Sequence, residues 1–175
     1  MINFICSRNN TEDKPLKNKI ALLLTAIVFI LTFTGCSEDP IASKFETDIN
    51  SFCADLADID KKMNEIDPLD EDAPDQLLMY LDQLDQKFKV FAAMSFPEEY
   101  SYLEPLADDA STYMTTAVTS FHEAYSNNSF NEYTEEYAYK NYERACKRIT
   151  VIVKLLNGED ISDEGVNVTV TDTAQ

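Results

Sequence analysis

Apolar residues recur at alternating spacings of three and four along most of the chain, as they do on one face of an α-helix. The first such stretch predicts an amphipathic helix over residues 43–66. Ser43 and Glu46 are spaced as in a capping box at its start, and Pro68 follows its end. Its apolar face consists of Phe45, Ile49, Phe52, Leu56, Ile59, Met63 and Ile66.

The second predicted helix starts near Pro74, a residue suited to a first helical turn, and its apolar face ends at Phe91. A third helical region follows another capping box, from Ser95 to Glu98. Since Pro105 disrupts a helix interior, we expect a kink there or a new helix start just before it. The apolar face of the third region contains several alanines, which permit close approach of neighbouring helices: Leu103, Ala107, Ala110, Met114, Ala117, Phe121 and Ala124.

A fourth helix is predicted over residues 130–156, after a third capping box formed by Ser129 and Glu132. Gly158 is a suitable helix stop. Residues 159–175 are acidic and lack a helical period, so we interpret them as a flexible, disordered tail. Four helices joined by short turns predict an all-α, antiparallel up-down four-helix bundle over residues 43–158.

An unbroken, mostly apolar run covers residues 20–35, preceded by Lys17 and Lys19 and followed by Cys36. This arrangement is typical of a secretory signal peptide. A membrane span needs about 20 residues, so the length disfavours the alternative of a membrane helix that stays attached.

The end of the run, Phe33-Thr34-Gly35-Cys36, resembles the lipobox of bacterial lipoproteins. In that family the cysteine receives a diacylglyceryl group and a signal peptidase cuts just before it. The resemblance implies a cleaved signal peptide over residues 1–35, lipidation at Cys36 and a tether over residues 36–42. The protein is then expected to be exported and anchored to the extracytoplasmic face of a bacterial membrane.

Charge narrows the choice of partners. The full chain carries a formal charge of −18, and residues 1–35 contain four basic and two acidic side chains, so the mature chain carries −20. A body of this charge repels phosphate backbones, and we therefore expect no nucleic acid partner.

Cys53 and Cys146 remain in the mature chain in addition to Cys36. The end of the first helix and the start of the last helix should lie together at one end of the bundle. Cys53 is thirteen residues from that end and Cys146 is sixteen, so the two cysteines are expected within one helical turn of each other along the bundle axis. An exported protein is not kept reduced, so a Cys53–Cys146 disulfide is predicted. The alternative is two unpaired, half-buried thiols.

The fourth predicted helix carries closely spaced tyrosines and half of the ten basic residues of the mature chain. Tyrosine and arginine are enriched at binding hot spots, so the candidate partner-binding residues are Tyr133, Tyr137, Lys140 and Arg144. The alternative is that the charges form stabilising pairs four residues apart and the tyrosines lie half in the core.

No catalytic, metal-binding or cofactor-binding motif is recognised, and the sequence predicts a non-enzymatic protein without cofactors. The only histidine, His122, is interpreted as a surface residue. The acidic segment over residues 67–75 raises a calcium hypothesis, but it lacks the glycine and spacing of an EF-hand. The predicted function is a lipid-anchored interaction or structural module of the cell envelope with a protein partner, and the alternative is a lipoprotein that binds a small ligand or divalent metal.

Overall fold

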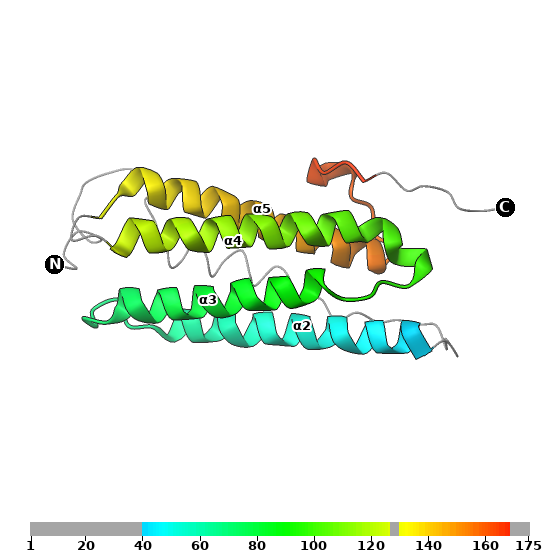
Figure 1. Cartoon of the computed structure of the whole chain (residues 1–175), viewed down its shortest axis with the longest axis horizontal. Coiled ribbons are helices and arrows are strands. Elements are labelled where there is room, and N and C mark those ends of the chain that lie inside the picture. Colours follow the sequence, from blue (N-terminus) through cyan, green and yellow to red (C-terminus); the bar gives the residue numbers. More distant parts are fainter. Residues whose placement is uncertain (1–39, 127–129, 169–175) are drawn as a thin grey trace.

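The computed structural model describes residues 40–126 and 130–168, which are helical without any β-strand. Backbone contacts are most extensive between helices that follow one another in the chain. The predicted class, an all-helical protein with four helices packed together, is confirmed. The four long helices lie side by side along the long axis of the molecule (Figure 1): α2 (Pro40–Glu65), α3 (Ala73–Ala92), α4 (Glu104–Ser126) and α5 (Glu132–Leu156).

The predicted signal peptide and the lipidation residue Cys36 lie outside the described residues. Within residues 40–126 and 130–168, no helix combines the length and the apolar character that a membrane crossing requires.

The observed helix starts differ from all three predicted capping boxes, and after Ser95 the N-cap is Pro97. Helix α2 begins at Pro40, so Ser43 lies inside the helix, where its carbonyl accepts a hydrogen bond from Thr47. Proline is tolerated in a first turn because its missing N–H has no partner there. At α5 the N-cap is Asn131, whose side chain accepts hydrogen bonds from the backbone N–H groups of Tyr133 and Thr134, at 3.1 and 3.2 Å.

The prediction at Pro105 is confirmed in its second form, a new helix start just before the proline. A 3₁₀ helix, η2 (Glu98–Leu103), leads into α4, which begins at Glu104 and therefore holds Pro105 in its first turn. No backbone hydrogen bond of a helix interior is lost to the proline at this position.

The core combines large side chains on one side with small ones on the other. Phe52 of α2 stacks on Phe91 of α3 with ring centroids 4.4 Å apart, and Phe45 lies 4.9 Å from Phe96. On α4 the apolar face is largely alanine and is fully buried, which lets α4 and α5 approach closely. All the residues of the predicted apolar faces of the first three helices are buried.

Helix α5 ends in a Schellman motif. The N–H of Gly158 bonds the carbonyl of Leu155 at 3.0 Å, and the N–H of Glu159 bonds the carbonyl of Lys154 at 2.8 Å. Gly158 has φ +70°, the left-handed conformation that this motif places just after the helix.

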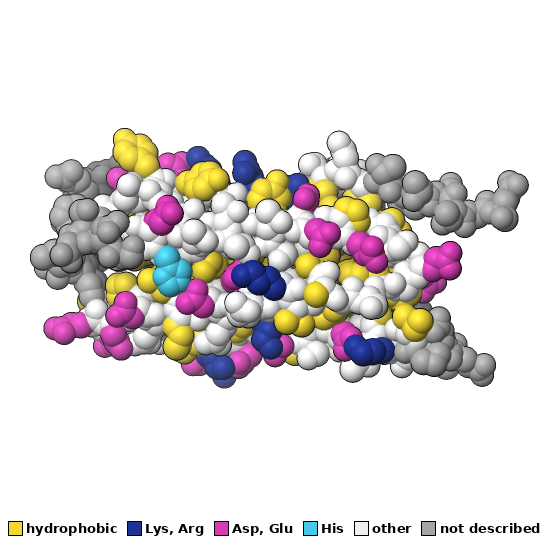
Figure 2. All heavy atoms as spheres, viewed as in Figure 1, with side chains coloured by type: hydrophobic (Ala, Val, Ile, Leu, Met, Phe, Trp, Pro, Cys, Tyr) yellow, Lys and Arg dark blue, Asp and Glu magenta, His cyan; other side chains and the backbone are white. Residues whose placement is uncertain are grey.

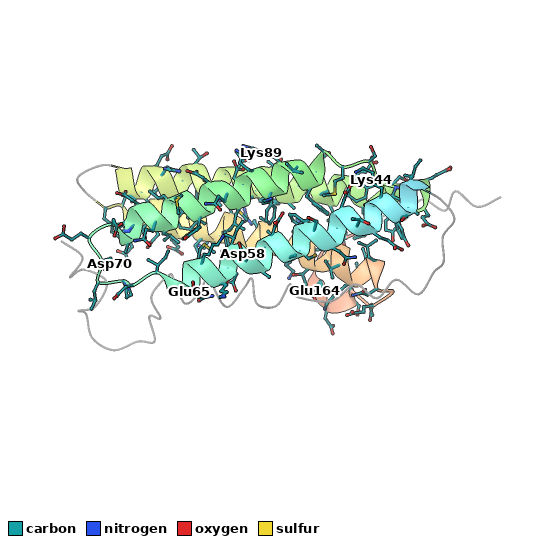
Figure 3. The ribbon with its side chains drawn as sticks, turned by 90° about the horizontal axis from the view of Figure 1, so that it is seen from below. Lys44, Asp58, Glu65, Asp70, Lys89 and Glu164 are labelled. Carbon is teal, nitrogen blue, oxygen red and sulfur yellow. The ribbon has the colours of Figure 1, made fainter. Side chains whose placement is uncertain are left out.

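Part of the segment interpreted as a tail is folded. After α5 the chain forms the short 3₁₀ helix η3 (Ser162–Glu164), and Ile161, Val166 and Val168 pack against the core. Glu164 bonds Lys154 of α5, so the segment is attached by charge as well as by apolar contact (Figure 3).

Charged side chains cover the outer surface of α2. Figure 3 labels Lys44, Asp58 and Glu65 along this helix, and each belongs to a pair spaced four residues apart. Such exposed pairs stabilise a helix only slightly.

Candidate functional site

The outer face of α5 carries the predicted partner-binding residues. Tyr133, Tyr137, Lys140 and Arg144 are all exposed and are spaced by four, three and four residues, which places them on one side of the helix. The exposed fraction is 85% for Tyr133 and 53% for Tyr137. Figure 2 shows hydrophobic side chains (yellow, tyrosine included) and basic side chains (dark blue) following one another along α5 at its upper edge. We call these four residues the α5 face.

The exposed aromatic surface extends beyond the start of the helix. Phe130 is exposed, and its ring centroid lies 5.6 Å from that of Tyr125, at the end of α4. The alternative that the tyrosines lie half in the core therefore does not apply to Tyr133 and Tyr137. It does apply to Tyr142, which is fully buried.

The two basic residues of the α5 face differ in their partners. Lys140 bonds Glu136 at 2.7 Å, which is one of the stabilising pairs anticipated from the sequence. Arg144 has its guanidinium carbon 5.7 Å from the centre of the Tyr113 ring. Among residues 40–126 and 130–168, Arg144 is the only basic side chain without a carboxylate oxygen within 4.0 Å.

A groove of about 490 Å³ adjoins the basic part of the α5 face. Lys140, Arg144 and Lys147 line it from α5, and Glu164 lines it from η3. Lys147 lies 4.0 Å from Glu164 and retains an exposed side chain. The wall formed by Glu164 was not anticipated, because residues 159–168 lack the helical period on which the other predictions depend.

The predicted Cys53–Cys146 disulfide is wrong, since both cysteines are free thiols. The prediction took the first and last helices as close neighbours, but among the described helices α2 makes its close backbone contacts mainly with α3. Asp60 of α2 is close enough to Cys146 to contribute to its raised pKa. Cys53 precedes Asp60 by seven residues, which is two helical turns or about 10 Å along the axis.

Burial makes both thiols poor nucleophiles. Loss of solvation raises the pKa of Cys53 to about 11 and that of Cys146 to about 12. The thiolate is the reactive form of cysteine, so neither side chain is activated near neutral pH.

Asp60, Tyr142 and Cys146 form a buried polar cluster between α2 and α5. Asp60 Oδ1 and the Tyr142 hydroxyl have no hydrogen bond of normal geometry to a described residue, although the hydroxyl lies beside the Cys146 thiol. Burial raises the pKa of Asp60 to about 6 and raises that of Tyr142 strongly. Burial of Asp60 could have been suspected from the sequence, because this acid directly follows the apolar Ile59. Its proximity to Tyr142 and Cys146 could not.

The remaining candidates have structural roles. His122 Nε2 lies 2.8 Å from Asp82 Oδ1 and joins α4 to α3. In the acidic segment, Asp67 accepts a hydrogen bond from the N–H of Leu69 at 2.9 Å. The part of the chain that the structure describes contains no group of three or more His, Cys, Asp and Glu side chains placed to hold a metal ion.

Comparison with known proteins does not add a relative: no family model, no curated protein and no solved structure matches the chain.

Proposed function

We propose that the mature protein is a lipid-anchored module of the bacterial cell envelope that binds a partner protein through the α5 face. The likeness of Phe33-Thr34-Gly35-Cys36 to a lipobox supports the anchor. Helix α2 begins at Pro40, so four residues after the lipidated Cys36 the chain would enter the folded domain.

The proposed arrangement of the domain is an antiparallel up-down bundle. The connections from α2 to α3 and from α4 to α5 span only residues 66–72 and 127–131, and the helices that follow one another in sequence are those that pack together. Short connections of this kind are typical of antiparallel neighbours.

One observation carries the binding proposal: two exposed tyrosines continue along the same helix face into exposed basic residues. Tyrosine contributes a large contact area with few rotatable bonds, arginine contributes a planar guanidinium with several donors, and both are enriched at measured binding hot spots. Two large exposed aromatic side chains on adjacent turns are unfavourable in water, and a partner that covers them would remove this cost.

Charge indicates the kind of partner. Arg144, which has no described carboxylate within 4.0 Å, and Lys147 provide hydrogen-bond donors on a body that is otherwise strongly acidic. A guanidinium binds a carboxylate through two parallel hydrogen bonds. The proposed partner is therefore a protein that presents Asp or Glu side chains beside an apolar patch.

The proposed role is binding without catalysis. Both described thiols have a pKa raised well above neutral by burial, which disfavours nucleophilic chemistry. The tyrosines with a resolved shift likewise have raised pKa values, because burial disfavours their ionised form.

In-cell photo-crosslinking tests this proposal. A photoreactive residue replacing Tyr133 in the full chain is expected to form a defined crosslinked product with one envelope protein. Arg144→Ala and Tyr137→Ala should each reduce that product about tenfold or more, the scale expected for a hot-spot residue.

Matched control substitutions lie on other helices. Lys61→Ala removes an exposed base from α2, and Val90→Ala trims an exposed apolar side chain on α3. Both should leave the crosslink unchanged. An equal loss with these controls, or no crosslink in membranes that hold the anchored protein, would contradict the proposal.

A further inference from the structure

A second groove lies between α3 and α4 and reaches Tyr125, which contacts Phe130 just before α5. It is a shallow groove of about 630 Å³ that is open to solvent, and its lining includes Asp75, Leu78, Met79 and Asp82 from α3 with His122 and Tyr125 from α4. Figure 2 shows this side of the molecule, with the histidine in cyan, acidic side chains beside it and hydrophobic side chains nearby.

The two carboxylates of the groove have a defined spacing. Asp75 and Asp82 are seven residues apart on one helix, so they lie on the same face and about 10 Å apart along the axis. Leu78 and Met79 occupy the turn between them. The groove therefore has an acidic group at each end of an apolar stretch.

The charges of this groove are not neutralised by lysine or arginine. No such residue lines it, and Asp75 makes no ion pair with a residue in the described ranges. Asp82 bonds His122 through Oδ1, which fixes the carboxylate between the two helices and leaves Oδ2 available.

The apolar part of the groove suits an aliphatic chain. Met79 is exposed, Leu78 is half-buried, and Tyr125 adds an aromatic ring. The Tyr125 hydroxyl already donates to Glu135 at 2.6 Å, so the ring is the group that remains for a ligand. Aromatic rings attract ammonium groups, and methylene groups gain from contact with Leu and Met.

We propose that this groove binds a linear aliphatic cation with two ammonium groups about 10 Å apart, one at Asp75 and one at Asp82. The carboxylates select for charge and for the length of the ligand, and the apolar stretch favours a hydrocarbon chain between the charges. A hydrated metal ion lacks this chain, and a monoamine can satisfy only one carboxylate.

The test uses the full-length protein in detergent micelles, labelled with ¹³C at the methionine methyl groups. Diaminooctane is titrated as the probe, and the Met79 methyl resonance is followed. We expect a saturable shift of Met79, while the buried Met63 and Met114 remain unchanged.

Matched ligands separate length and charge. Diaminopropane is too short to reach both carboxylates, and aminooctane has the chain with only one ammonium group. Each should bind about tenfold more weakly than diaminooctane, the loss expected for one charge-assisted hydrogen bond. Equal affinity of diaminooctane and aminooctane would overturn the proposal.

Matched variants separate the groove from the general attraction of an acidic protein for cations. Asp75→Asn and Asp82→Asn should each weaken binding about tenfold, whereas Asp70→Asn, in the connection between α2 and α3, should leave the dissociation constant within about twofold. Asp75→Asn provides a test that does not disturb the His122 contact. Equal weakening by Asp70→Asn and Asp75→Asn, or the absence of a Met79 shift, would overturn the proposal.

Discussion

Asp85 on α3 and Thr115 on α4 are joined by a hydrogen bond of 2.6 Å, donated by Thr115 Oγ1 and accepted by Asp85 Oδ1. The other carboxylate oxygen accepts from Lys89 Nζ at 2.6 Å. Asp85 is only 7% exposed, so these two donors compensate for the loss of water around its charge. This link fixes the register of α3 against α4, which also determines the shape of the groove between them.

Thr115→Val tests the link, because valine keeps the shape of threonine and removes only the donor. We expect the free energy of unfolding to fall by about 1–3 kcal/mol, since a buried carboxylate loses one of its two partners. Thr119→Val is the control, because that hydroxyl bonds a carbonyl at the exposed surface and its loss should cost less than about 0.5 kcal/mol. Denaturant unfolding measures both, and equal effects would show that the link to Asp85 is not stabilising.

Asp60 predicts an unusual dependence of stability on pH. Burial raises its pKa from 3.8 to about 6, so the folded state binds a proton more tightly than the unfolded state does. The contribution of Asp60 to stability is then fully present below about pH 4 and is lost as the pH rises through 6. A shift of this size corresponds to about 3 kcal/mol at neutral pH.

Asp60→Asn removes the titrating group, while Tyr142 and Cys146, its neighbours on α5, remain neutral over this range because their pKa values are raised. We expect the variant to gain stability over the wild-type protein progressively between pH 4 and 7. Unfolding by urea at several pH values measures the difference. An unchanged pH profile in Asp60→Asn, or an equal change in the exposed control Asp70→Asn, would show that Asp60 does not titrate as described.

The free thiols give a direct chemical prediction. In unreduced protein, alkylation of Cys53 and Cys146 should be slow in the folded state at pH 8, because their pKa values of about 11 and about 12 leave little thiolate. After unfolding without reductant, both should react completely. Peptide mass mapping records the labelling, and labelling that needs prior reduction would restore the disulfide.

Cys53→Ser provides an independent test of whether Cys53 and Cys146 are free thiols. Loss of a native disulfide typically costs about 2–5 kcal/mol, whereas replacing a half-buried free thiol should cost less than about 1.5 kcal/mol. A larger loss accompanied by faster labelling of Cys146 is the result expected of a broken bridge.

The sequence predicted the helices well because their signals are local. The apolar periodicity identified every buried apolar residue from Phe45 to Ile66, though not the buried Asp60, and Pro105 marked the start of α4 within one residue. Contacts between helices depend on how far each helix is shifted along its axis and rotated about it, and a periodic pattern does not give these values. The disulfide prediction also assumed that the first and last helices lie close together, whereas α2 makes its close backbone contacts mainly with α3.

Among the candidate sites, those on a single helix follow from local sequence, and those between helices do not. Tyr133 and Tyr137 are exposed because they lie on the side of α5 away from the buried Ala138 and Tyr142. The groove between α3 and α4 could not be predicted, because it depends on how two helices are placed relative to each other. The packing of Val166 and Val168 could not be predicted either, because this segment has no helical period.

The alanine face of α4 predicts sensitivity to larger side chains. Ala117 is fully buried, and α4 and α5 are in close contact along their lengths. Ala117→Leu should therefore lower the free energy of unfolding by about 1–3 kcal/mol through overpacking. Ala93→Leu, at the exposed end of α3, is the control and should change it by less than about 0.5 kcal/mol. Thermal unfolding compares the two, and a neutral Ala117→Leu would mean that α4 and α5 have room between them.

Cys36 is expected to carry acyl groups as the first residue of the mature protein. Intact mass of the membrane-extracted protein should then correspond to residues 36–175 plus lipid, and extraction should require detergent, because each buried methylene contributes about 0.8 kcal/mol to membrane binding. Cys36→Ala removes the acceptor thiol, so it should leave an unacylated chain that retains residues 1–35. Cys53→Ser, which also removes a thiol, should leave both processing and extraction unchanged. A wild-type mass that includes residues 1–35 would favour a retained membrane helix, and the α5 face would then have to be tested on the side of the membrane to which that helix directs it.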